Sequence, residues 1–166
     1  MKIIKAQKNE EKILYILRGP SGTGKSTLAK TLGAKQVFSA DDYFMQGDNY
    51  VFNPDKLGIA HGNCKSLTLK AMYHGVSPIA VDNTFTTKKE IKPYVELANR
   101  YNYKIEFVEP NWSPELRNED DTWNVDFIEK MQQNPDRVKM NKSLPREIIE
   151  KMVNRYQYGL TPDDIL

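Results

Sequence analysis

Short apolar segments alternate with longer segments of helical pattern along most of the chain. Four runs rich in aliphatic and β-branched residues predict strands at 13–17, 36–39, 78–81 and 104–108. The stretches between and after them have helical spacing at 25–32, about 57–74, 88–101 and 145–156. Strands that alternate with helices of this length predict right-handed βαβ units and a parallel sheet. We therefore expect an α/β protein with three layers, α/β/α, in which residues 1–166 form a single domain.

One segment, residues 111–144, does not follow this alternation. It contains two prolines, two tryptophans and an acidic cluster, and only residues 124–132 predict a short helix. Long polar segments inside compact domains are often lids or binding loops, although a solvated insertion without a role has the same composition. We therefore predict that residues 111–144 form a lid.

A glycine-rich turn joins the first predicted strand to the first predicted helix. It matches the pattern G-x-x-x-x-G-K-[ST] in the strand–loop–helix context that this pattern requires. Its residues are Gly19, Pro20, Ser21, Gly22, Thr23, Gly24, Lys25 and Ser26. The glycines let the backbone curl so that successive N–H groups face a phosphate at the positive end of the helix dipole. The sequence predicts a nucleoside triphosphate site here, and the alternative is a glycine-rich turn with a solvated lysine.

Three side chains at the end of this loop have expected roles. Lys25 is expected to place a positive charge on the β- and γ-phosphates, and Ser26 to offer a hydroxyl ligand to Mg²⁺. Thr27 follows directly and is counted among the nucleotide-binding residues. ATP and Mg²⁺ are therefore the expected ligands.

Two aspartates follow the predicted strand 36–39, at the sheet edge where parallel α/β proteins bind their ligands. Phosphoryl transfer to a hydroxyl needs a carboxylate that orients the nucleophile and accepts its proton. Asp41 is the predicted base, although any aspartate here would also be a useful helix cap. Asp42 is expected to cap the following helix or to support its neighbour.

A second acidic position, Asp82, follows the predicted strand 78–81. It is expected to act through a metal-bound water or to orient the acceptor. The alternative is a structural role, in which Asp82 only stabilises its own loop. Ser26 and Asp82 together form the predicted metal site. The predicted acceptor site consists of Asp41, Asp42, Tyr43, Asp82 and Asn83.

Composition narrows the possible partners and the compartment. The formal net charge is +2, so a nucleic-acid site would have to be local rather than a broad basic surface. The single cysteine, Cys64, excludes an internal disulfide, and no apolar run is long enough to span a bilayer. The first twenty residues lack the features of a signal peptide. We expect a cytoplasmic protein without a membrane partner, and the sequence identifies no protein partner.

The residues around the glycine-rich loop resemble a known family. The run from Leu14 to Ala29, followed by Phe38-Ser39-Ala40-Asp41-Asp42-Tyr43-Phe44, resembles the polynucleotide-kinase-like branch of P-loop kinases. Within that branch it is most similar to small AAA-domain ATPases related to Nedd-binding proteins, with matching motifs at 50–55, 60–61, 81–84 and 92–94. The resemblance extends over about residues 13–156 and implies a P-loop kinase fold.

The resemblance also implies roles for particular residues. In bacteriophage polynucleotide kinases the first aspartate of the pair is the general base, which assigns that role to Asp41. The arginine that follows their Asp-Asp-Tyr motif is replaced here by Phe44, so the acceptor site is expected to differ. Their lid arginine corresponds to Lys139, with Arg137 two residues earlier. We favour Arg137 as the lid cation because a planar guanidinium can bind two phosphate oxygens, and the alternative is a solvated surface cation.

The leading expectation is an ATP-dependent kinase that transfers the γ-phosphate to a hydroxyl, with a polynucleotide 5′-OH end as the first acceptor. One alternative is a kinase of small molecules or modified bases, which Phe44 favours. Another is a regulatory nucleotide-binding module without an acceptor. Asp41 discriminates between these classes, because ATP sensing requires Lys25 and Ser26 but no base.

Overall fold

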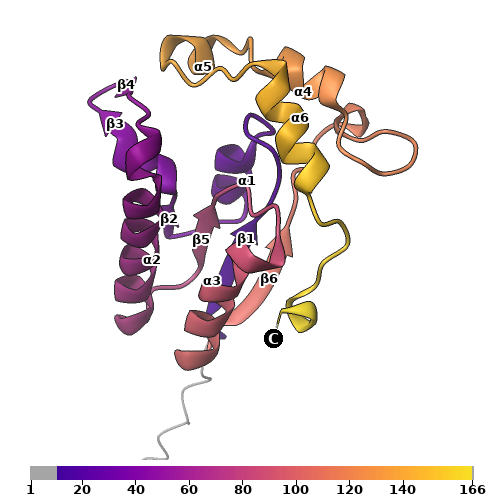
Figure 1. Ribbon diagram of the computed structural model, residues 1–166. Helices are drawn as coiled ribbons and strands as arrows, with labels where there is room; N and C mark the ends of the chain where they lie inside the picture. The colour runs from indigo at the N-terminus through magenta and orange to yellow at the C-terminus, as the bar shows by residue number, and fades with distance from the viewer. Residues whose placement is uncertain (1–10, 166) are drawn as a thin grey trace, which may run out of the picture.

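A four-stranded parallel sheet forms the centre of the computed structural model, which describes residues 11–165 (Figure 1). The spatial order of its strands is β2-β5-β1-β6. Their bounds are β1 Ile13–Leu17, β2 Gln36–Phe38, β5 Ile79–Asp82 and β6 Lys104–Val108. All four strands that the apolar runs predict are present, and each adjacent pair is parallel.

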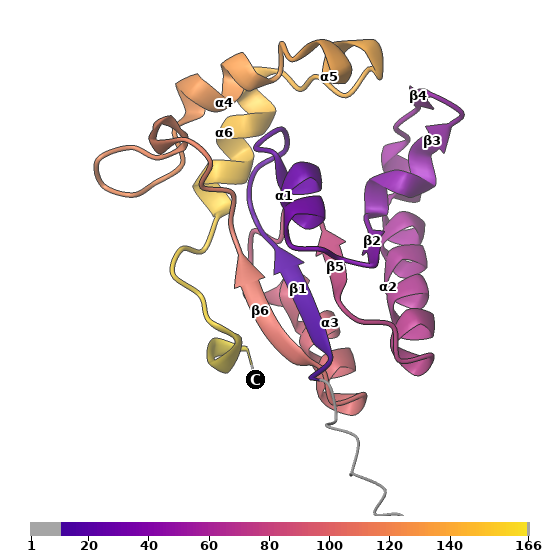
Figure 2. The ribbon, with the colours of Figure 1, turned by 180° about the vertical axis from the view of Figure 1, so that it is seen from behind.

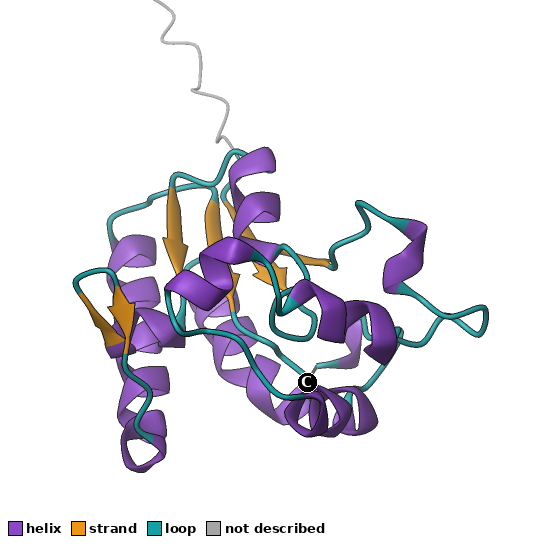
Figure 3. Ribbon diagram, turned by 90° about the horizontal axis from the view of Figure 1, so that it is seen from above, coloured by secondary structure: helices purple, strands orange, loops and turns teal. Residues whose placement is uncertain are grey.

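The helices α1 Lys25–Thr31, α2 Leu57–Tyr73, α3 Lys88–Arg100 and α6 Arg146–Arg155 match the four predicted helices to within a few residues. The described chain also contains α4 Val125–Met131, α5 Pro135–Lys139 and a small hairpin, β3 Met45–Gln46 with β4 Asn49–Tyr50. Its short 3₁₀ turns are η1 Ala40–Phe44, η2 Pro54–Lys56, η3 Pro114–Leu116 and η4 Pro162–Asp164. Figure 3 shows the hairpin as a separate pair of strands beside α2, away from the main sheet.

Alternate side chains of the central strand β1 fill two separate apolar layers. Leu14 and Ile16 pack into the larger layer with buried residues of α2 and α3. Leu17 points the other way and packs with Ala29 of α1. Because successive strand residues face opposite sides, this arrangement places helices on both faces of the sheet. The predicted α/β/α layering is therefore confirmed.

The segment 111–144 contains more regular structure than the sequence predicts. Besides the expected short helix, which is α4, it forms η3 and α5. Helix α5 has only five residues, with a proline in its first turn and the side chain of Asn134 as its N-cap. Such a helix is too short to show an apolar period, so the prediction of a single short helix was incomplete.

This segment packs with α6 around its own apolar cluster. The buried members of that cluster are Leu116, Trp123, Ile128, Ile149 and Tyr156. Figure 2 shows α4, α5 and α6 together beyond the carboxyl ends of the strands. The segment therefore lies at the ligand-binding edge of the sheet, and its role as a lid stays a prediction.

A buried arginine anchors the base of the glycine-rich loop. Arg18, which is 1% exposed, donates from Nε to the carbonyl of Phe85 at 2.9 Å and from a terminal nitrogen to the carbonyl of Gln157 at 2.8 Å. Its guanidinium also lies 4.4 Å from the ring centroid of Tyr156. Residues near both ends of the described chain therefore meet directly beneath the loop.

Within residues 11–165, no helix combines the length and the apolar character that crossing a membrane would require.

Candidate active site

The glycine-rich loop connects β1 to α1 in a conformation that depends on its glycines. Gly22 and Gly24 have φ angles of +84° and +92°, which side-chain-bearing residues rarely adopt. A Cβ atom on Gly22 would also lie only 2.6 Å from Nε2 of Gln132. At the start of the turn, the Thr23 hydroxyl donates to the carbonyl of Pro20 at 2.8 Å. The loop is thus fixed by its own backbone conformation and by a contact from the lid segment.

Lys25 turns back into the loop. Its Nζ donates to the carbonyls of Gly19 at 2.8 Å and Pro20 at 3.0 Å, and the residue is 7% exposed. Burial holds the pKa of Lys25 below its ordinary value, while the charges of Asp82 and Asp41 act to raise it. The ammonium group therefore lies in a partly desolvated site, within the electrostatic reach of two carboxylates.

The two predicted metal ligands are neighbours although they come from different elements. Ser26, in the first turn of α1, donates from its hydroxyl to Oδ2 of Asp82 at 3.0 Å, where β5 ends. Hydroxyl and carboxylate oxygens are the donors that Mg²⁺ prefers. Thr27 is exposed on the same turn and accepts a bond from Thr31 through its carbonyl at 3.1 Å.

The two neighbouring aspartates have different surroundings. Asp42 is part of a capping box in which its carboxylate accepts from the backbone N–H of Ser39 at 3.3 Å. Desolvation raises the pKa of Asp42 above its ordinary value. Asp41 instead accepts a hydrogen bond at 3.0 Å from the hydroxyl of Tyr50. Asp42 thus caps η1, whereas the Asp41 carboxylate is directed toward a hydroxyl group.

The other predicted acceptor residues flank this position. The side-chain oxygen of Asn83 accepts from the backbone N–H of Ala40 at 2.9 Å, so it joins the end of β5 to the start of η1. Tyr43 packs edge-on against Phe44 at 5.5 Å between ring centroids and keeps part of its surface exposed. The side-chain oxygen of Asn83 therefore supports the loop, and Tyr43 remains available to a ligand.

A buried glutamine, absent from the sequence-based prediction, links the lid segment to the glycine-rich loop. Gln132 is 1% exposed, and its Nε2 donates to the carbonyl of Ser21 at 2.9 Å. Its Oε1 accepts from Nε of Arg137 at 3.2 Å and from the backbone N–H of Leu144 at 3.2 Å. A single polar side chain at a helix end carries no sequence signal for such a role, because its partner lies more than a hundred residues away.

The two candidate lid cations lie on the same short helix but in different environments. Nε of Arg137 is 3.2 Å from the position that a Cβ on Gly22 would take, and a terminal nitrogen donates to the carbonyl of Lys142 at 2.8 Å. Burial lowers the pKa of Arg137, and the charges of Asp41 and Asp82 oppose that shift. Lys139 is exposed. The geometry brings Arg137 to the loop, whereas it leaves Lys139 in solvent.

An indole ring lies beside the same loop. Nε1 of Trp112 donates to the carbonyl of Thr23 at 2.9 Å, and a Cβ on Gly24 would lie 3.0 Å from that nitrogen. The ring is 55% exposed, whereas Trp123 is fully buried in the lid cluster. Of the two tryptophans, only Trp112 therefore presents a surface next to the loop.

A family model described as an AAA domain matches residues 14–122, which include the glycine-rich loop, the Asp41-Asp42 pair and Asp82. The chain belongs to this AAA domain family. Membership confirms the resemblance to small AAA-domain ATPases of the polynucleotide-kinase-like P-loop branch.

Curated relatives share the loop-bearing part of this AAA domain. NEDD4-binding protein 2 of Homo sapiens is 40% identical over 103 residues, which cover 60% of this chain and 6% of that protein. A 2′,3′-cyclic-nucleotide 3′-phosphodiesterase of Rattus norvegicus is 30% identical over 112 residues, which cover 61% of this chain and 24% of that protein. The matched region is therefore a minor part of both relatives.

Solved structures match almost the whole AAA domain chain. A chain of the Pnkp1/Rnl/Hen1 RNA repair complex has a TM-score of 0.64 and 20% identity, and the match covers 93% of this chain and 47% of that chain. A protein described as a candidate kinase of Chloroflexus aurantiacus has a TM-score of 0.58 and 16% identity, with coverage of 92% and 84%. These matches confirm the predicted P-loop kinase fold.

Proposed function

We propose that this AAA domain is a kinase that transfers the γ-phosphoryl group of ATP to a hydroxyl, with a polynucleotide 5′-OH end as the first candidate acceptor. The observation that carries this proposal is the position of Asp41 at the ligand-binding edge of the sheet. The charge of its carboxylate acts on both Lys25 of the loop and Arg137 of the lid segment. A module that only senses ATP has no need of such a carboxylate.

Residues of the loop and of β5 are suited to the phosphate donor. Lys25 would contact the β- and γ-phosphates, and the hydroxyl–carboxylate pair of Ser26 and Asp82 would hold Mg²⁺, since both present oxygen donors 3.0 Å apart. Bound Mg²⁺ offsets the negative charge that builds up on the phosphates during transfer. Arg137 would add positive charge from the lid side.

Asp41 would act on the acceptor. Its carboxylate orients the attacking hydroxyl and takes up its proton as the bond to the γ-phosphorus forms. The remaining parts of the site then stabilise charge, because phosphoryl transfer depends mainly on positioning and electrostatics. Asp42 contributes by fixing η1, on which Asp41 lies.

The surroundings of Asp41 support an acceptor with a flat ring. Tyr43 lies on η1 with Asp41, and Phe52 stacks on Tyr50, which contacts Asp41. The rings of Tyr43 and Phe52 are both partly exposed, and aromatic surfaces stack on nucleobases. Phe44 is buried among these rings, so the position that carries an arginine in the phage kinases offers no cation here. Lys142 lies 5.4 Å from the ring centroid of Tyr50 and provides a positive charge on this side. A terminal nucleotide fits this combination of rings and charge.

The acceptor is tested with γ-labelled ATP, Mg²⁺ and matched DNA or RNA strands that end in either 5′-OH or 5′-phosphate. We expect label only on the 5′-OH strands, and less of it as salt is raised, because salt weakens contacts to the phosphate backbone. Label on a nucleoside, sugar or modified base but on no 5′-OH strand would establish the small-acceptor kinase instead. ATP binding without transfer to any acceptor would indicate a regulatory module.

The assignment of Arg137 as the lid cation leads to a separate prediction. Arg137→Ala is expected to lower kcat by about 10²-fold while changing the KM for ATP only a few-fold, because charge on the transferred group is met best in the transition state. Lys139→Ala is the matched control, since it removes a cation from the same helix that is exposed to solvent. Steady-state kinetics measure both parameters. Equal losses in the two variants would contradict the assignment of Arg137.

A further inference from the structure

Tyr50 presents a hydroxyl group to the candidate base. The phenol donates to Oδ1 of Asp41 at 3.0 Å, which is the separation that a nucleophile and its general base require. Among the described hydrogen bonds, this is the one that the Asp41 side chain accepts. The protein thus already holds one hydroxyl in the place proposed for the acceptor.

The phenol is fixed by the hairpin and by the rings around it. Tyr50 pairs with Met45 in the antiparallel β3–β4 hairpin. Its ring lies nearly parallel to that of Phe52, with an interplanar angle of 13° and 6.3 Å between centroids, and meets Phe44 edge-on at 5.9 Å. Such packing restricts the ring, so the contact with Asp41 does not depend on a mobile surface side chain.

The lid segment reaches the same tyrosine. The backbone N–H of Tyr50 donates to the carbonyl of Met140 at 3.1 Å, and Nζ of Lys142 lies 5.4 Å from the ring centroid. The positive charge of Arg137, whose Nε borders Gly22, acts on the phenol as well. Tyr50 therefore contacts the candidate base and lies within the electrostatic reach of Arg137, the cation of residues 111–144 that we assign to the donor phosphates.

We propose that Tyr50 is itself a phosphoryl acceptor, modified within its own chain when a nucleoside triphosphate occupies the loop. This inference rests on the proposed kinase function. The phenolic oxygen forms a bond to the γ-phosphorus while the bond from that phosphorus to the β,γ-bridging oxygen breaks. The phenolic proton passes to Asp41 and the nucleoside diphosphate leaves with the bridging oxygen. Burial and the Asp41 charge raise the pKa of Tyr50, so the phenol needs a base to lose its proton.

The product would remain in favourable surroundings. A phosphotyrosine carries between one and two negative charges near neutral pH and binds well to arginine and lysine side chains. Lys142 and Arg137 are the cations on this side of Tyr50. The new phosphate would lie beside the Asp41 carboxylate, whose negative charge opposes it, and would fill the place proposed for an external hydroxyl. The modified chain is therefore expected to phosphorylate external acceptors more slowly than the unmodified one.

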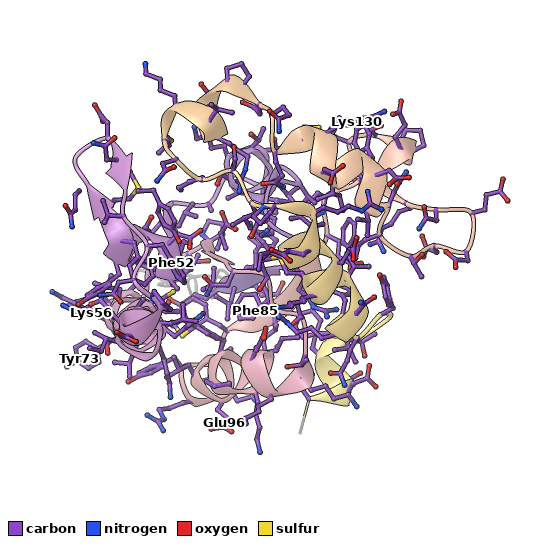
Figure 4. The ribbon with its side chains drawn as sticks, turned by 45° about the horizontal axis from the view of Figure 1, so that its top comes forward. Phe52, Lys56, Tyr73, Phe85, Glu96 and Lys130 are labelled. Atoms are coloured by element: carbon purple, nitrogen blue, oxygen red, sulfur yellow. The ribbon has the colours of Figure 1, made fainter. Side chains whose placement is uncertain are left out.

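The test begins with the full chain, treated with a phosphatase and repurified, then incubated with MgATP and no added acceptor. Intact mass spectrometry is expected to show a gain of one phosphoryl group, and peptide mapping to place it on Tyr50. The rate per chain should not depend on protein concentration. Tyr50→Phe, which keeps the stacked ring, and Asp41→Asn should both lose the modification. Tyr73→Phe is the control, because Tyr73 is 71% exposed and projects outward from α2 (Figure 4).

The outcomes separate this inference from the proposed function. If the wild-type chain phosphorylates an external acceptor but never Tyr50, the kinase assignment stands and the self-modification is wrong. In that case a slower Tyr50→Phe variant would mean that the phenol only orients Asp41. A rate per chain that rises with concentration would show transfer between copies and would also overturn the proposal. A wild-type chain that forms neither ADP nor phosphoprotein with any acceptor would contradict the proposed function.

Discussion

Replacement of Lys25 by alanine is expected to lower the rate of phosphoryl transfer by at least about 10³-fold, the scale for losing a charge that stabilises the transferring group. The affinity for MgATP should also fall. Because Lys25 is buried and donates to two loop carbonyls, the variant is expected to be less stable by about 1–3 kcal/mol as well. Calorimetric titration, turnover and denaturant unfolding measure the three effects.

Lys30→Ala is the control for this variant. Lys30 lies in the last turn of the same helix and is exposed, so its removal tests the loss of a positive charge without a change in the loop. We expect its affinity and turnover to match the wild type. Unchanged MgATP binding and turnover in Lys25→Ala would disprove the assignment of the glycine-rich loop as the phosphate site.

Asp41→Asn is expected to lower turnover by about 10²-fold or more, while the affinity for MgATP stays within a few-fold of wild type. The substitution keeps the volume of the side chain but removes the group that accepts the proton. The amide can still accept the hydrogen bond from Tyr50, so η1 and the hairpin should retain their positions. Single-turnover measurements at saturating MgATP separate the chemical step from donor binding.

Asp42→Asn provides the matched comparison, since it changes the adjacent carboxylate in the same way. Asp42 caps η1 through the backbone N–H of Ser39, so we expect a smaller loss of turnover, with a loss of stability of up to about 1 kcal/mol. A larger loss of turnover in Asp42→Asn than in Asp41→Asn would mean that the base is Asp42. If neither variant loses turnover, the base lies elsewhere.

The strands and the main helices could be predicted because their signals are local. Runs such as Ile13–Leu17 and residues 78–81 are apolar, as expected for strands covered on both faces, and α3 and α6 have a regular apolar period. The β3–β4 hairpin and α5 gave no such signal. Two residues per strand and five residues in a helix are too few to establish a period.

The candidate site likewise contains residues that could be predicted from the sequence and residues that could not. The glycine-rich loop was predictable because its chemistry requires particular residues at fixed spacing, and Asp41 and Asp82 because they follow predicted strands. Gln132 and Tyr50 were not assigned from the sequence. Gln132 reaches Ser21, which lies more than a hundred residues earlier, and the backbone N–H of Tyr50 donates to the carbonyl of Met140, so only the folded chain brings these segments together.

The contacts of the buried Arg18 determine where the C-terminal boundary of an expressed AAA domain fragment should lie. The family match ends at residue 122. The Arg18 guanidinium nevertheless donates to the carbonyl of Gln157 and lies over the ring of Tyr156, and both residues come after that point. A fragment cut at the family boundary would lose both contacts and leave a charged group under the phosphate loop without them. Expression fragments and domain fusions should therefore retain the chain at least through Gln157, because both contacts to Arg18 lie beyond the recognisable family segment.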